Sequence, residues 1–197
     1  AVIMLSLNIK YDFLVELLRR MIRLMAELTQ MNYCYCLFCE TKKCQQVANA
    51  LEKAGIHRAL SPKIIKRQRR QGKNIDILFD LLPGYVFVYS SEPVDLSAMM
   101  VEGVIRALGC PECGFCLQGY DRLFANKIFE TDGLIKAIRI IQIGDVIHID
   151  DPLFAECNGV VRHIDYRKKR AKIELQLFNA NCFCWVACDV INTNGKK

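Results

Sequence analysis

The sequence lacks the motifs and residue clusters that most enzyme classes need. It contains only three histidines among 197 residues, and none of them has the spacing to serine or cysteine that is typical of a catalytic pair. Neither a GxxxxGK[ST] phosphate loop nor a GxGxxG dinucleotide motif is present. The adjacent carboxylates Asp150 and Asp151 adjoin a predicted turn, where we expect them to bond to backbone amides. We therefore predict a protein that is not an enzyme and needs no cofactor.

Long hydrophobic runs are also missing. The apolar stretch 1–9 has no basic region before it and is too short to cross a bilayer. The 11 cysteines are an odd number. Several of them alternate with other residues in strand-like runs, where a thiol behaves as a small buried hydrophobe. We therefore expect a reducing, cytoplasmic setting and no membrane partner.

A complete set of zinc ligands is missing as well. Cys110, Cys113 and Cys116, in CPECGFC, have metal-like spacing, but a tetrahedral zinc site needs a fourth ligand. The candidates for that ligand are distant in the sequence: Cys39, Cys44 and His57. Because no second CxxC lies nearby, we predict a thiol-bearing loop and no metal, with a zinc site as the alternative.

What the sequence does contain is apolar residues for a core and concentrated positive charge. Apolar residues make up 52% and charged residues 24% of the chain, which predicts a folded protein. The formal net charge is +6. The stretch 61–75 holds six cations and no acid, and the stretch 162–172 holds six cations against Asp165 alone. Such clustering favours a polyanionic partner, and the alternative is two solvated loops.

Residues 1–133 show the pattern of an α+β protein. Apolar residues recur at helical spacing in 11–29, which predicts an amphipathic helix in an N-terminal extension, residues 1–30. The domain 31–133 that follows is predicted to be an antiparallel sheet with helices. Its expected elements are a strand at 33–39, a helix at 42–54 capped by Thr41 and ended by Gly55, a basic loop, a strand at 81–90, a short helix at 95–101, a strand at 103–108 and a helix at 119–131.

After Gly133 the pattern changes to strands alone. We treat 134–143 as a linker, 144–192 as a small all-β barrel and 193–197 as a tail. Strand alternation places Ile173, Leu175 and Leu177 in the barrel core and Lys172 on the outer side. The run Arg167 to Arg170 then lies at a hairpin tip.

Several ordered motifs resemble the NusG family of transcription elongation factors, in particular its LoaP-type antiterminators. "GDVIHIDDPLFAECNGVVRHIDYRKKRAKIELQLF" is similar to the SH3-like KOW domain of that family, and "YCLFCET", "LLPGYVFVYS", "GVIRALG" and "DRLFANKIFETDG" are similar to its N-terminal domain. The resemblance covers residues 31–192 in the family's order. An ordered set of motifs is more specific than any one of them.

The resemblance implies a polymerase-binding transcription factor. It implies that an apolar surface of the N-terminal domain binds the clamp helices of RNA polymerase, through Tyr35, Leu82, Pro83, Tyr85 and Phe87. Phe154, in the first turn of the KOW domain, matches a residue that holds other transcription or translation factors, and we expect it to be exposed. A monomer is expected.

For nucleic acid, the charge clusters supply the candidates. RNA is favoured, with DNA of the elongation complex as the alternative. The predicted contacts are Lys66, Arg67, Arg69, Arg70, Arg167, Lys168, Lys169, Arg170 and Lys172. The second function class is a ribosome-associated or general RNA-binding KOW protein without polymerase binding. The N-terminal motifs favour the first class.

Overall fold

The computed structural model describes residues 15, 18, 31–56, 58–70 and 73–192 of the chain. The predicted helix 11–29 and the tail 193–197 lie outside the described residues, apart from Val15 and Leu18. In the part of the chain that is described, no helix is both long enough and apolar enough to cross a membrane.

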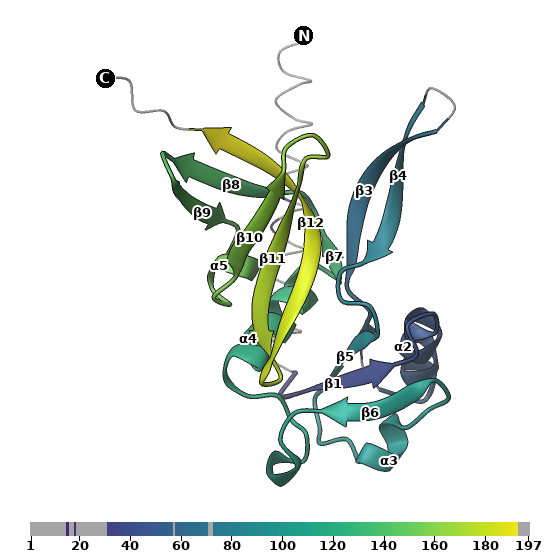
Figure 1. Cartoon of the computed structure of the whole chain (residues 1–197). Helices are drawn as coiled ribbons and strands as arrows, with labels where there is room; N and C mark the ends of the chain where they lie inside the picture. Colours follow the sequence, from purple (N-terminus) through teal and green to yellow (C-terminus); the bar gives the residue numbers. More distant parts are fainter. Residues whose placement is uncertain (1–14, 16–17, 19–30, 57, 71–72, 193–197) are drawn as a thin grey trace.

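Four antiparallel strands form a first sheet, here called the N-terminal sheet (Figure 1). Its strand order is β2-β5-β1-β6. The strands are β1 (Tyr33–Cys39), β2 (Arg58–Leu60), β5 (Tyr85–Ser90) and β6 (Val104–Leu108). The central strand β1 is apolar on both faces because both faces are covered. The strands predicted at 33–39, 81–90 and 103–108 are confirmed, with β5 starting only after the Pro-Gly turn.

Helices pack on both faces of the N-terminal sheet. On one face, Val47 and Leu51 of α2 (Cys44–Lys53) join Met99 of α3 (Leu96–Met99) against the sheet. On the other face, α4 (Gly119–Glu130) places Phe124 5.8 Å from Phe87, between ring centroids. The Tyr89 hydroxyl donates to the Ala125 carbonyl at 2.6 Å, so α4 is fixed by a polar bond as well as by packing.

The start of α2 differs from the prediction. The helix begins at Cys44, and the residue before it, Lys43, makes no side-chain cap bond. Thr41 lies in a turn that the Lys43 amide closes by donating to the Glu40 carbonyl at 2.8 Å. The prediction that Thr41 caps the helix is therefore wrong. Gly55 follows the helix with φ +94°, a conformation that favours glycine at a helix end.

The basic segment 63–73 was predicted as a loop, and this is wrong: it lies mostly in a β-hairpin that projects from the body (Figure 1). Strands β3 (Lys63–Arg70) and β4 (Lys73–Asp80) pair, and β7 (Leu134–Ile135) adds a third strand beside β3. Apolar side chains in both strands explain the pairing, since Ile64 lies opposite Phe79 and Ile65 opposite Leu78. The many basic residues of the segment made it look like a loop, although its apolar residues are typical of strands.

Five strands form a second sheet, here called the C-terminal sheet, in the order β10-β11-β12-β8-β9. They are β8 (Ile138–Ile143), β9 (Val146–Asp150), β10 (Val160–Asp165), β11 (Arg170–Leu177) and β12 (Ala180–Asn192), and the short helix α5 (Pro152–Ala155) lies between β9 and β10. Strands β8 and β12 are parallel, and the other neighbours are antiparallel. The segment 134–143, treated above as a linker, contributes β7 and β8.

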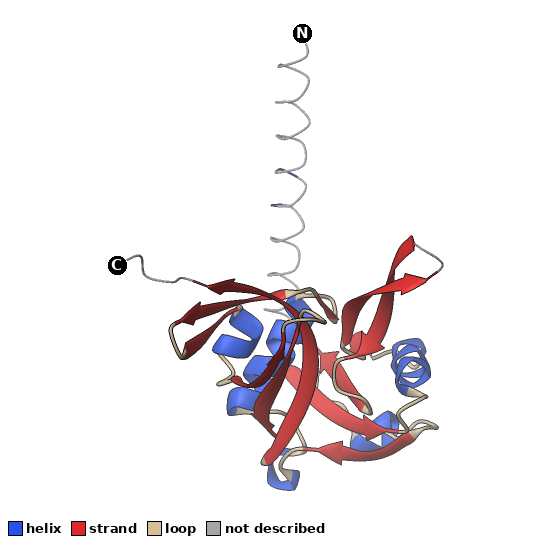
Figure 2. Ribbon diagram, turned by 45° about the horizontal axis from the view of Figure 1, so that its top comes forward, coloured by secondary structure: helices blue, strands red, loops and turns tan. Residues whose placement is uncertain are grey.

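The inner face of the C-terminal sheet is apolar. Ile173, Leu175 and Leu177 of β11 are buried, as the strand alternation predicts. They belong to one apolar cluster with α4 and with Phe87 of the N-terminal sheet, and Figure 2 shows the helices and sheets gathered on one body. The predicted mixed α+β fold is confirmed. The identity of the C-terminal sheet as a KOW-type barrel stays a prediction.

Candidate functional site

Tyr85 lies where the N-terminal and C-terminal sheets meet. Its ring stacks on Phe178 with centroids 5.8 Å apart and planes at 24°. Its hydroxyl lies 3.7 Å from the Cys182 sulfur, and burial raises the pKa of Tyr85 above its ordinary value. The residue predicted to contact polymerase is thus half-buried against the turn that joins β11 to β12.

That turn, Phe178–Asn179, has an unusual backbone. Both residues have positive φ, 54° and 57°, as in a two-residue type I′ hairpin turn. The left-handed region suits asparagine but is uncommon for a bulky side chain. Phe178 is held there because its amide donates to the Asp121 carboxylate of α4 at 2.9 Å and its ring packs on Tyr85 and Phe87. Burial raises the pKa of Asp121, and the bond from Phe178 opposes that rise.

The other predicted polymerase contacts are divided between two faces. Leu82 and Phe87 are buried in the same cluster as Tyr85, and Pro83 is exposed. Tyr35 is buried on the opposite face, beside α2, and its hydroxyl accepts from the Val94 amide at 3.1 Å. Successive side chains of a strand point to opposite faces, and Cys34, Cys36 and Phe38 are the residues of β1 that face the Tyr85 side. Phe38 meets the Tyr85 ring edge-on, with centroids 5.6 Å apart. The structure therefore does not bring Tyr35 to Tyr85.

Phe154 is fully buried, so the expectation that it is exposed is wrong. Asp151 accepts from the Leu153 amide at 3.1 Å and starts α5, which turns Leu153 and Phe154 inward. The segment after α5 turns back toward the helix, since the Gly159 amide donates to the Phe154 carbonyl at 2.7 Å. A Cβ on Gly159 would lie 2.7 Å from that carbonyl oxygen, so glycine is required there.

The basic run lies in the turn after β10, and its last residue, Arg170, starts β11. Arg167, Lys168 and Lys169, here called the basic tip, are exposed. One Asp165 oxygen accepts from the Lys168 amide at 3.0 Å, and the other accepts from Arg170 Nε at 3.2 Å. The amide bond from Lys168, followed by the bond from Arg170, lowers the pKa of Asp165. Arg170 is therefore part of the turn's structure, whereas the basic tip carries no such bond from its side chains among the contacts described.

Aromatic rings lie beside these cations on the outer face, defined as the side of β10, β11 and β12 that points away from the core. The Arg170 guanidinium is 4.3 Å from the Trp185 ring centroid, and Lys172 Nζ is 4.6 Å from that of Phe183. His163 meets Trp185 edge-on at 5.8 Å. Sequence reasoning missed both rings of β12, although alternation with the buried Cys182 and Cys184 would have placed Phe183 and Trp185 outside.

The second cluster of predicted nucleic-acid contacts lies on β3. Lys66, Arg67, Arg69 and Arg70 pair with Ile77, Asp76, Asn74 and Lys73 of β4. The structure describes the backbone of these four basic residues and not their side chains. They belong to a different sheet from the basic tip, and their role stays a prediction.

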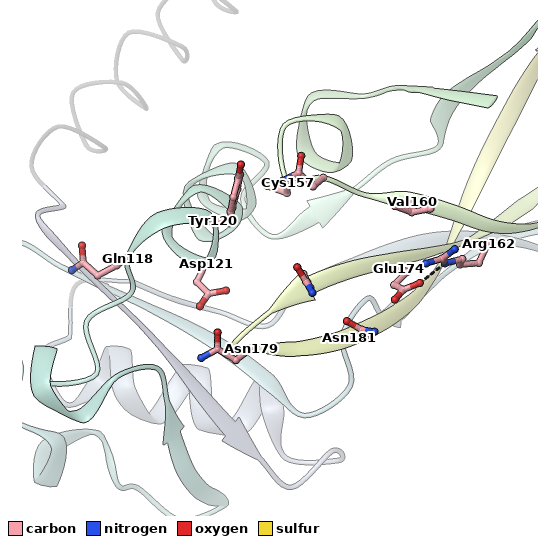
Figure 3. A pocket seen from close by; sticks show the side chains of 11 residues that line it. Gln118, Tyr120, Asp121, Cys157, Val160, Arg162, Glu174, Asn179 and Asn181 are labelled. Atoms are coloured by element: carbon pink, nitrogen blue, oxygen red, sulfur yellow. Dashed lines mark hydrogen bonds and ion pairs between the residues drawn. The ribbon is translucent and has the colours of Figure 1, made fainter. Parts of the chain in front are cut away.

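A cavity of about 730 Å³ opens between α4 and the outer face. Figure 3 shows its walls, with Tyr120 and Asp121 from α4 on one side and the β11–β12 hairpin on the other. Amide side chains dominate the lining: Gln118, Asn158, Gln176, Asn179 and Asn181. Arg162 of β10 and Glu174 of β11 form an ion pair on the sheet side of the cavity. Such a lining can donate and accept hydrogen bonds but carries little net charge.

The cysteines fall into two groups. Eight of the 11 are buried, and the other three are Cys110, Cys113 and Cys116. Cys113 ends the short helix η1 (Pro111–Cys113) and Cys110 precedes it; both are exposed, and Cys116 is partly buried. Amide bonds from Cys113 and Glu112 lower the pKa of Cys110. Within the described ranges, no three His, Cys, Asp or Glu side chains gather as a metal ion would require. The choice of a thiol-bearing turn over zinc stays a prediction.

Comparison with known proteins bears on the N-terminal sheet. Residues 32–113 match the family model described as "Transcription termination factor nusG". This part of the chain is similar to the NusG family. The transcription termination/antitermination protein NusG of Escherichia coli K12 is 28% identical over 106 residues, which are 49% of this chain and 55% of the relative. The NusG of Buchnera aphidicola from Acyrthosiphon pisum is 26% identical over 121 residues, 56% of this chain and 61% of the relative.

The chain thus spans about half the length of the curated relatives it matches. A solved structure described as "Domain interaction in Thermotoga maritima NusG" is 18% identical and has a TM-score of 0.46. It covers 78% of this chain and 92% of that chain. The predicted resemblance to the NusG family is confirmed over residues 32–113, and the LoaP-type specialisation stays a prediction.

Proposed function

We propose that this protein is a non-enzymatic transcription elongation and antitermination factor of LoaP type. Its N-terminal sheet binds RNA polymerase at the clamp helices, and its C-terminal sheet, as a KOW domain, binds nucleic acid. The observation that carries the proposal is the NusG match over 32–113. That range includes β5 with Tyr85, a large aromatic side chain that is half-buried at the edge of the core.

Tyr85 is the residue on which the polymerase contact is best tested. Large aromatic rings at the centre of an interface commonly contribute about 2 kcal/mol or more to binding. Tyr85→Ala is expected to weaken binding to core RNA polymerase at least tenfold, measured by pull-down and by titration with labelled protein. Tyr85→Phe keeps the ring and is expected to bind as the native chain does.

Tyr120→Ala is the matched control, since Tyr120 is an exposed tyrosine on α4. Thermal melting of all three variants separates binding from folding. Native affinity of a folded Tyr85→Ala variant would mean that the interface lies elsewhere. If the native chain binds RNA but not polymerase, the ribosome-associated or general RNA-binding alternative holds instead.

A further inference from the structure

Phe183 is an aromatic side chain that the core does not use. It lies in the middle of β12 with 49% of its surface exposed, and Glu174 is its partner across the strand pair. The core positions of the same strand are filled by Cys182 and Cys184. An exposed ring on a regular sheet offers a flat apolar surface on which a planar ligand can stack.

Cations flank this ring in fixed positions. Lys172 Nζ lies over the Phe183 ring, and Arg170 lies over Trp185 while its Nε bonds to Asp165. Between residues 160 and 177 the chain carries six cations against two acids, a net charge of +4. Both acids are in ion pairs, Asp165 with Arg170 and Glu174 with Arg162. A ligand that suits this face has planar rings and regularly spaced negative charges.

The face continues from the ring into the amide-lined cavity. Gln176 lies directly opposite Asn181, next along the strands from Glu174 and Phe183, and both line the cavity. Amide side chains match the hydrogen-bonding edges of nucleobases, and they can also bond to a ribose 2′-hydroxyl. Base edges and base faces are both accessible only in an unpaired strand.

We propose that the outer face binds single-stranded RNA, with a base stacked on Phe183, phosphates at Lys172, Arg170 and the basic tip, and a neighbouring nucleotide in the amide-lined cavity. This inference rests on the proposed function, because a transcription factor of this family works where unpaired RNA is made. Beyond the proposed function, the inference names unpaired RNA as the ligand and names the residues that would distinguish it from duplex RNA.

Trp185 is the only tryptophan of the chain, so its fluorescence reports on this face. The full chain is titrated with a pyrimidine RNA of about twelve nucleotides, a length that a small β-domain can cover. Trp185 emission is expected to be quenched on binding. Phe183→Ala is expected to weaken binding roughly tenfold with the salt dependence unchanged, since the ring neutralises no phosphate.

Three control variants test whether the aromatic face of Phe183 is what binds. Phe183→Tyr is expected to bind as the native chain does, and Phe183→Leu, which keeps apolar area but has no aromatic face, is expected to be as weak as Phe183→Ala. Ile105→Ala removes a similarly exposed apolar side chain from β6 and is expected to have no effect.

Several results would overturn the inference. They are unchanged affinity of Phe183→Ala, equal binding of the RNA as a duplex, and equal binding of single-stranded DNA of the same sequence. The polymerase pull-down is run with Phe183→Ala in parallel. Retained polymerase binding together with native RNA affinity would overturn this site and leave the proposed function standing.

Discussion

At the scale of single residues, four adjacent cations have two different roles. In the sequence, Arg167 to Arg170 form one basic run, but the structure separates Arg170, which is bonded to Asp165 and lies over Trp185. Asp165 also accepts from the Lys168 amide, so a single carboxylate holds both ends of the turn. The positive φ of Lys169, 46°, shows that this turn needs such support.

Asp165→Ala is expected to lower Tm at neutral pH, because it removes both bonds of the turn. The folded protein lowers the pKa of Asp165, so its stabilisation is present above the ordinary carboxyl pKa of 3.8 and is lost as the pH falls through the lowered folded value. The difference in Tm between native chain and variant should therefore shrink below about pH 4.

Asp165→Asn is the matched variant, since its carbonyl can still accept from the Lys168 amide but carries no charge for Arg170. Its Tm should lie between those of the native chain and Asp165→Ala. A Tm difference that persists unchanged to low pH would mean that the charge of Asp165 contributes nothing to the turn.

Whether a side chain is buried could be predicted where the two-residue alternation of a strand decides it. Ile173, Leu175 and Leu177 alternate with polar residues, so their burial follows from the strand pattern. Tyr35 lies in a strand that is apolar on both faces, and alternation alone cannot say which face meets Tyr85. Phe154 was misplaced because a short turn of helix, α5, points it inward, and a four-residue helix leaves no periodic signal.

At the scale of elements, hairpins carry the charge of this protein. Strands β3 and β4 replace the expected loop at 63–73, and the basic tip joins β10 to β11. Strand β3 has two adjacent isoleucines followed by polar and basic residues, so it looks like a loop by composition, and only the pairing with β4 identifies it. Strands with an apolar alternation, such as β11, could therefore be predicted from the sequence. Strand β3 could not, because it is recognised only by its pairing with β4.

Replacing the basic tip, Arg167, Lys168 and Lys169, by serine is expected to leave Tm nearly unchanged and to weaken RNA binding. The plot of log affinity against log salt should flatten by about 0.7 to 0.9 for each phosphate that the variant no longer neutralises. The control removes the same charge elsewhere, by serine at three exposed lysines: Lys42, Lys53 and Lys136. If both triple variants change the slope equally, net charge alone governs binding and the tip is a solvated turn.

At the scale of the whole molecule, the two sheets are joined through the candidate site itself. One apolar cluster runs from Phe87 through α4 to the inner face of the C-terminal sheet. The turn Phe178–Asn179 covers Tyr85 at the edge of that cluster. This arrangement could not be read from the sequence, because it depends on packing between segments about 90 residues apart. If Tyr85 binds polymerase, the turn and polymerase compete for the same ring.

Phe178→Asn tests that competition. Asparagine tolerates the left-handed backbone of the turn, so the variant removes the ring without adding strain. Tm is expected to fall because the ring no longer packs on Tyr85 and Phe87, and polymerase affinity is expected to rise several-fold, since an aromatic pair contributes about 1 kcal/mol. Asn179→Gly keeps the ring and the turn and is expected to change neither quantity. A lower Tm with unchanged polymerase affinity would show that covering Tyr85 does not limit binding, and the stack would then serve only to hold the two sheets together.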